Sequence, residues 1–216
     1  YWRDASAGST LCTEHVDDAH ALLAGARGLL VGGIVMAVSA SARAAAFAAM
    51  RAVSAAGGVV TYDPNVRPKL AGAAAARQVL AEAARFAGVV TPSCPADSRL
   101  LFDTGIPGEA ADRTLELGAR AALVTCGTDD AVLAHGESRT RLPVPVNPGA
   151  VDATGAGDVL AGTLTARLAL GDELPDAARL GIAAASLSVA GLGGTGRIPA
   201  LADSRELALA HLGGGR

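Results

Sequence analysis

The residues best suited to chemistry form a glycine-rich run at positions 151–158, which reads Val-Asp-Ala-Thr-Gly-Ala-Gly-Asp and opens into an apolar run typical of a helix. Small residues at Gly155, Ala156 and Gly157 leave backbone N–H groups free to converge on an anion at the positive end of that helix. Asp158 follows in the first helical turn, beside the expected anion, where a general base belongs. The segment predicts an oxyanion or phosphate cradle with a catalytic carboxylate.

The same run has a plainer interpretation. It is then an ordinary helix start, in which Asp152 or Thr154 caps the first turn and Asp158 offsets the helix dipole. The Gly-Ala-Gly sequence between two aspartates favours the functional interpretation.

A second polar group occupies positions 62–68, Tyr-Asp-Pro-Asn-Val-Arg-Pro, at the carboxyl end of a predicted strand. Ligands bind at this edge in open α/β sheets. Arg67 offers a fork of donors to a carboxylate or phosphate, and Asp63 and Asn65 offer donors and acceptors suited to hydroxyls. In the alternative interpretation, Asp63 and Asn65 only build an Asx turn before proline.

A third candidate is the Thr-Cys-Gly-Thr segment at 125–128, which ends another predicted strand. In one interpretation Thr125 and Gly127 face a nucleotide. In the other, Gly127 only makes the turn into the next strand.

Spacing excludes other motifs. A Walker-type loop needs a lysine after its second glycine, whereas the only lysine, Lys69, follows Pro68. Residues 191–196 match G-x-G-x-x-G, but they follow a predicted helix and Pro199 comes too soon for another, so we expect a loop. The four histidines and three cysteines lack catalytic or zinc-binding spacing, which predicts reduced thiols and no protein-bound metal site.

Composition bounds the class of protein. The chain has 216 residues, 50% hydrophobic and 18% charged, which predicts one folded domain over 1–216 without a linker. Its apolar runs fall short of the ~20 residues that a membrane span needs. A formal net charge of −3 and 3% aromatic residues argue against nucleic-acid binding. Because the chain opens at Tyr1 with neither an initiator methionine nor a signal segment, we expect a fragment of a cytoplasmic protein.

Apolar, β-branched runs alternate with alanine-rich stretches up to Pro148, the pattern of a parallel sheet buried on both faces. We expect strands at 28–35, 58–62, 88–91, 121–125, 130–134 and 140–144. We expect helices at 16–26, 41–56, 73–86, 96–102, 109–118, 155–170, 175–189 and 204–212. The part after Pro148 is therefore predicted to be helical only.

Together, the glycine-rich run, the Asp-Pro-Asn-Val-Arg-Pro segment at 63–68 and the Thr-Cys-Gly strand end at 125–127 resemble those of the ribokinase-like sugar kinases, or phosphofructokinase-B family. The opening segment 1–7 is similar to the aromatic-x-Arg-x-x-Ser-Ala segment of the branch with 2-keto-3-deoxygluconate kinases and fructokinases. The resemblance implies an α/β fold, a three-layer α/β/α (Rossmann-like) arrangement with a mostly parallel sheet. It would lack the N-terminal strands and β lid that relatives carry in roughly a hundred further residues.

By this resemblance the protein is an ATP-dependent carbohydrate kinase that uses Mg²⁺. It would phosphorylate a hydroxyl of a small sugar or sugar acid, with 2-keto-3-deoxygluconate favoured. Asp158 would remove the proton of that hydroxyl, while Gly155, Ala156 and Gly157 would neutralise the transferring phosphoryl group. The resemblance assigns the ATP site to Thr125 and Gly127 as well as the cradle, and the substrate site to Arg3, Asp63, Asn65 and Arg67.

Three alternatives stay open. In the first alternative, the protein is a fructokinase or another sugar kinase of the same family. In the second, it is a truncated homologue that binds nucleotide without transferring phosphate. In the third, it is a Rossmann-type oxidoreductase domain, and only the α/β alternation supports this alternative. For a longer chain, the resemblance also allows a homodimer.

Two departures from the family pattern bear on the site. Relatives carry Asn-x-x-Glu, which organises water around magnesium, where this chain has Ser93-Cys94-Pro95-Ala96 followed by Asp97. Where relatives have a second glycine after the nucleotide-site glycine, this chain has Asp130, so we expect a negative charge near the triphosphate.

Overall fold

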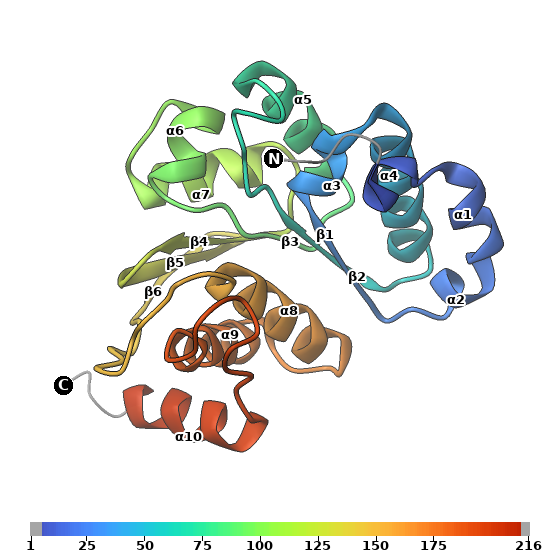
Figure 1. The fold of residues 1–216 in the computed structure, drawn as a ribbon. Helices are drawn as coiled ribbons and strands as arrows, with labels where there is room; N and C mark the ends of the chain where they lie inside the picture. Colours follow the sequence, from blue (N-terminus) through green and yellow to red (C-terminus); the bar gives the residue numbers. More distant parts are fainter. Residues whose placement is uncertain (1–5, 213–216) are drawn as a thin grey trace.

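The computed structural model describes residues 6–212, and its centre is a six-stranded sheet whose strand order follows chain order (Figure 1). The strands are β1 (Gly28–Gly32), β2 (Val59–Asp63), β3 (Val89–Val90), β4 (Ala121–Cys126), β5 (Asp129–His135) and β6 (Ser138–Leu142). Strands β1 to β4 are parallel, and β4, β5 and β6 are antiparallel. Only two residues join β4 to β5, so the chain must reverse there. Gly127 makes this turn in a left-handed conformation, with φ of 66°.

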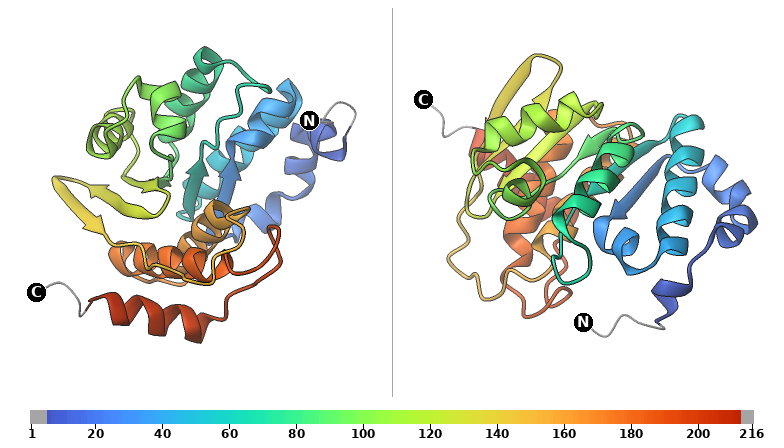
Figure 2. Two further views of the ribbon diagram at one scale, coloured as in Figure 1. Left: turned by 60° about the vertical axis from the view of Figure 1, so that its left-hand side comes forward. Right: turned by 90° about the horizontal axis from the view of Figure 1, so that it is seen from above.

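Helices cover both faces of the sheet, which gives three layers (Figures 1 and 2). On one face lie α3 (Gly33–Val38), α4 (Ala40–Ala55), α5 (Ala73–Ala84), α6 (Ala96–Phe102) and α7 (Pro107–Glu116). The short helices η1 (Ala7–Thr10), α1 (Thr13–Asp18) and α2 (His20–Ala24) pack beside α4. On the opposite face lie α8 (Ala156–Ala169) and α9 (Leu174–Ser188), with α10 (Leu201–Leu212) packed outside α9.

The central strand β4 separates two apolar cores. Ala122 and Val124 belong to the core beneath α4 to α7, whereas Ala121 and Leu123 belong to the core beneath α8 and α9. Successive side chains of a strand point to opposite faces, so an unbroken apolar run serves both layers at once. The alanine-rich helices pack closely on this sheet.

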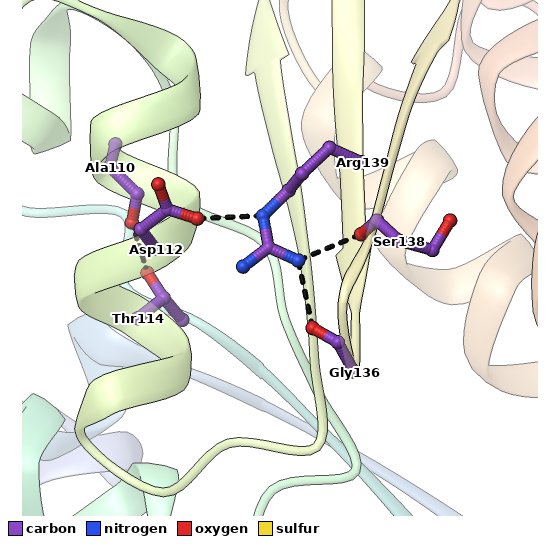
Figure 3. Close-up of polar contacts among 6 residues, drawn as sticks. All are labelled: Ala110, Asp112, Thr114, Gly136, Ser138 and Arg139. Carbon is purple, nitrogen blue, oxygen red and sulfur yellow. Dashed lines mark hydrogen bonds and ion pairs between the residues drawn. The ribbon is translucent and has the colours of Figure 1, made fainter.

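Arg139, at the start of β6, fastens the β5–β6 hairpin to α7 (Figure 3). Its Nε donates to Oδ1 of Asp112 at 2.6 Å, and its Nη1 donates to the carbonyl oxygens of Gly136 and Ser138 at 2.9 and 2.8 Å. These contacts hold the turn of the hairpin against the helix that packs on its strands.

The expected α/β order, the three layers and the helical end of the chain are confirmed. The strand expected at 28–35 is wrong beyond Gly32, because α3 begins at Gly33. A Cβ atom at Gly33 would collide with the carbonyl oxygen of Pro64, so this position brings two backbones together and turns the chain. The expected helix 16–26 is two short helices that break at Ala19.

The other boundaries differ by a few residues. Strand β6 ends at Leu142 rather than at 144, because Pro143 cannot donate a hydrogen bond to a neighbouring strand. Residues 191–196 form turns and bends, as expected from their position. Within 6–212, no helix is long and apolar enough to cross a membrane.

Candidate active site

The carboxyl ends of β2, β3 and β4 meet the start of α8 around one cavity of about 430 Å³. Seven residues that the sequence singled out line this cavity: Asp63, Asn65, Arg67, Thr125, Gly155, Gly157 and Asp158. Parallel strands end at the same edge of a sheet, which brings these distant segments together. Arg3, also expected at the substrate site, lies outside the described residues.

The start of α8 is a cradle of bare backbone. Gly155 occupies the N-cap position with φ of 82°, and no side chain caps the helix. A Cβ atom at Gly155 would lie 2.9 Å from the Cα atom of Gly194, so both conformation and space require glycine here. At Gly157, by contrast, no heavy atom lies within 4 Å of an added Cβ atom, and the position opens into the cavity.

Asp152 does not cap this helix. Its Oδ1 accepts the N–H of Thr154 at 2.9 Å, and its Oδ2 accepts the N–H of Gly193 at 2.8 Å. Hydrogen bonds from Thr154 and Gly193 lower the pKa of Asp152. Asp152 thus ties loop 191–196 to the cradle, and the plain capping interpretation does not describe this helix start.

A second, mostly apolar cavity of about 580 Å³ adjoins the first. The two share Thr125, Ala153 and Leu160, and the second also contains Gly127 and Ala156. Its apolar walls come from loop 143–150 and from α9, at Val144, Val146, Ala150, Ile182 and Val189. The loop is held to α9 at a single residue, because Asn147 Nδ2 donates to the carbonyl of Ser186 and Ser186 Oγ donates to the carbonyl of Pro145, each at 2.7 Å.

The polar loop after β2 carries the remaining expected substrate residues. Asn65 has φ of 39°, a left-handed conformation that is uncommon outside glycine. The Nη1 atom of Arg67 donates to the carbonyl of Val66 at 3.2 Å. Within the described chain, Arg67 forms no ion pair. Its guanidinium therefore remains available to an anionic ligand.

Asp63 lies in a strongly negative part of this cavity. Burial, followed by the charges of Asp97 and Asp158, raises its pKa from 3.8 to about 7, although Arg67 and the backbone of Asn65 act in the opposite direction. Near neutral pH the Asp63 carboxyl group is thus partly protonated. Around Asp63, the electrostatics favour a group that brings positive charge or donates hydrogen bonds, whereas Arg67 provides a positive charge elsewhere in the cavity.

Sequence reasoning placed too little weight on the segment after β3. Thr91, Ser93 and Asp97 line the cavity. Asp97 is 3% exposed and accepts three hydrogen bonds from the protein. The sequence held only a weak signal for this residue, because Asp97 follows Ser93 by four residues, one more than in a reciprocal helix cap. Asp130 lines a third cavity with Arg139 and Arg141, which shares Cys126 and Thr128 with the apolar cavity, and its expected place near the triphosphate stays a prediction.

Comparison with known proteins identifies the family of the chain. Residues 2–201 match the family described as pfkB family carbohydrate kinase, and the chain belongs to that family. Among individual proteins, a 2-dehydro-3-deoxygluconokinase from Thermoproteus tenax is 33% identical over 214 residues, which cover 96% of this chain and 62% of that protein.

Two solved structures share the fold. The PfkB protein from Polaromonas sp. JS666 has a TM-score of 0.79 and 30% identity, over 95% of this chain and 65% of that one. A putative Ribokinase II from E. coli in complex with ATP and Mg²⁺ has a TM-score of 0.79 and 26% identity, over 93% and 64% of the two chains. The chain thus spans about three fifths of the length of these relatives.

Proposed function

We propose that the protein is an ATP-dependent carbohydrate kinase that transfers the γ-phosphoryl group of ATP to a hydroxyl of a small sugar or sugar acid. The observation that carries this proposal is the uncapped, glycine-lined start of α8, with Asp158 in its first turn, facing the same cavity as Asp63, Asn65 and Arg67. Membership of the pfkB family supports the same activity.

In this mechanism the chain positions the reactants and stabilises charge. The backbone N–H groups of Gly155 and Gly157 would offset the negative charge of the transferring phosphoryl group. The N–H of Ala156, also expected in this role, donates instead to the carbonyl oxygen of Ala153 at 3.2 Å. Asp158 accepts the proton of the attacking hydroxyl. Phosphoryl transfer passes through a loose transition state, so orientation and electrostatics supply most of the catalysis and no covalent enzyme intermediate is needed.

The apolar cavity suits the base of the nucleotide. Its walls at Val144, Val146 and Ile182 would bury a planar aromatic ring, and Thr125 and Gly127 lie at the strand end beside it. Because this cavity meets the polar one at Ala153 and Leu160, a nucleotide could extend from one to the other with its phosphates over the cradle.

Magnesium fits this site as part of a metal–nucleotide complex. The described residues hold no group of three or more His, Cys, Asp or Glu residues that could bind a metal ion alone. Magnesium is usually bound by phosphate oxygens, water and one or two carboxylates, and the negative lining of the cavity suits that arrangement. When bound, the ion would neutralise charge on the phosphate oxygens.

For the acceptor we propose a sugar acid such as 2-keto-3-deoxygluconate. Arg67 lines the polar cavity without an ion pair in the described structure and could bind a carboxylate with two parallel hydrogen bonds. The Thermoproteus tenax relative supports this class of acceptor. A neutral sugar such as fructose would offer the same guanidinium only hydroxyl groups.

A coupled assay of ADP release over a panel of neutral sugars and sugar acids tests both parts of the proposal. We expect ATP-dependent turnover that is fastest with 2-keto-3-deoxygluconate. Faster turnover of fructose would overturn the sugar-acid assignment and leave the kinase assignment intact. If ATP binds by calorimetry but no acceptor is phosphorylated, the alternative of a nucleotide-binding homologue without kinase activity is correct.

A further inference from the structure

Asp97, in the first turn of α6, is a buried carboxylate that joins two separate segments of the chain. Its Oδ2 accepts hydrogen bonds from the backbone N–H and the hydroxyl of Ser93, at 2.9 and 2.7 Å. Its Oδ1 accepts the backbone N–H of Val66 at 2.8 Å, across 31 positions of sequence. Since Asp97 is 3% exposed, these protein donors take the place of water around the carboxylate.

The hydrogen bonds of Asp97 to Ser93 and to Val66 stabilise different parts of the structure. The bonds to Ser93 are local, and Ser93 Oγ in turn accepts the N–H of Asp97 at 3.2 Å, just before the start of α6. A helix start requires no partner in a distant loop, so the bond to Val66 has no part in forming α6. It links the loop after β2 to the loop after β3.

Val66 lies between the two side chains that the loop presents to the cavity, Asn65 and Arg67. The carbonyl of Val66 accepts a hydrogen bond from Arg67 Nη1, and its N–H donates to Asp97, so both backbone groups of this residue are engaged. Asn65 has a left-handed conformation, which asparagine adopts more readily than most residues. The Asp97–Val66 bond fixes the backbone directly after this turn.

We propose that Asp97 is the positioning residue for the acceptor side of the cleft, and this inference rests on the proposed kinase function. Through Val66, it fixes the direction in which Asn65 and Arg67 face the cavity. Its two oxygens already accept three protein donors, so Asp97 acts on a substrate through the loop rather than by contact. A carboxylate suits this task because charge-assisted hydrogen bonds are shorter and stronger than neutral ones.

The test compares Asp97→Asn with Ser98→Ala in steady-state kinetics. The asparagine keeps one acceptor oxygen but turns an NH₂ group toward donor groups, so we expect the KM for the sugar acceptor to rise roughly 10- to 100-fold. The KM for ATP and kcat should change by less than about threefold, because the donors to the Asp97 carboxylate are Val66 and Ser93, neither of which lines the apolar cavity assigned to the nucleotide base. Ser98 is fully buried in the same helix and donates to the carbonyl of Thr104 at 2.7 Å, away from the loop. Ser98→Ala should lower Tm and leave the acceptor KM unchanged.

A second measurement does not depend on catalysis. In amide hydrogen exchange followed by NMR, the N–H of Val66 should exchange faster in Asp97→Asn than in Ser98→Ala, at matched global stability. Equal exchange in the two variants, or equal effects on the acceptor KM, would overturn the inference. If the unmodified protein phosphorylates no acceptor, the proposed function fails and the exchange of Val66 alone decides the role of Asp97.

Discussion

At the scale of single residues, the site depends on carboxylates in unlike surroundings. Asp158 is exposed at the start of α8. Asp63 lies inside the cavity, where its pKa is raised. Asp97 is buried, and its carboxylate accepts three hydrogen bonds. Sequence alone does not distinguish these three states, because each depends on which distant strand end lies beside the side chain. The structure therefore predicts a different consequence for each residue.

Asp158→Asn should lower kcat by about 10² to 10⁴, the usual contribution of a positioned base, and leave ATP affinity nearly unchanged. The matched control is Asp176→Asn, because Asp176 also lies in the first turn of a helix, α9, but does not line either cavity. Steady-state kinetics and calorimetry with ATP measure the two effects. Turnover equal to that of the control would remove Asp158 from the mechanism.

Asp63 should make the free energy of unfolding depend on pH. Its pKa of about 7 in the folded state exceeds its ordinary value of 3.8, so between these values the folded protein holds a proton that the unfolded chain has lost. The contribution of Asp63 to stability therefore falls as pH rises through this window, by at most about 1.4 kcal/mol per pH unit.

Urea unfolding at about pH 5 and about pH 7.5 tests this expectation, because the first pH lies between the two pKa values of Asp63 and the second lies above both. The unmodified protein should lose free energy of unfolding between the lower and the higher pH. Asp63→Asn should lose less, so the variant gains stability relative to the unmodified protein at the higher pH. Asp18→Asn, at an exposed carboxylate on α1, serves as the control. The same pH dependence in all three proteins would show that Asp63 titrates normally.

At the scale of secondary-structure elements, the start of α8 and the interior of β2 have separate roles. The helix start leaves backbone groups uncapped beside a cavity, as expected for binding an anion. The strand is buried on both faces and supports the sheet. Substitutions in the two elements should therefore affect ligand binding in one case and stability in the other.

Gly157→Val should weaken ATP binding more than tenfold, because a branched side chain would enter the space that phosphate needs. Gly162→Val is the matched control, since it lies on the same helix and an added Cβ atom there also meets no heavy atom within 4 Å. Calorimetric titration with ATP, paired with a thermal melt, separates binding from folding. Equal ATP affinities for the two variants would mean that the cradle does not contact the nucleotide.

Thr61→Val should raise the free energy of unfolding by roughly 1 kcal/mol. The Oγ1 atom of Thr61 is fully buried in β2 and has no hydrogen-bond partner within residues 6–212, so the substitution removes an unsatisfied polar group. Thr114→Val is the control, because Thr114 is equally buried but donates to the carbonyl of Ala110 at 2.7 Å. Urea unfolding should separate the two, and a destabilised Thr61→Val would mean that the hydroxyl has a partner.

At the scale of the whole molecule, the sequence predicted the layers and most of the site. Apolar, β-branched runs identified the strands, and glycine-rich or proline-flanked strand ends identified the residues that line the candidate site. The break at Gly32 was not predicted, since it depends on the closeness of Pro64 to Gly33, which only the folded chain reveals. The link from Asp97 to Val66 escaped prediction for the same reason.

The position of α8 determines when the site forms during folding. Each strand pairs with its neighbour in sequence, so β1 to β6 can assemble progressively as the chain emerges during synthesis. Helix α8, however, comes from the last third of the chain and packs back on β1 and β2, where a Cβ atom at Gly28 would lie 2.9 Å from that of Ala169. The strands can thus pair before α8 reaches its place, and the candidate cleft is complete in a nascent chain only when α8 has docked.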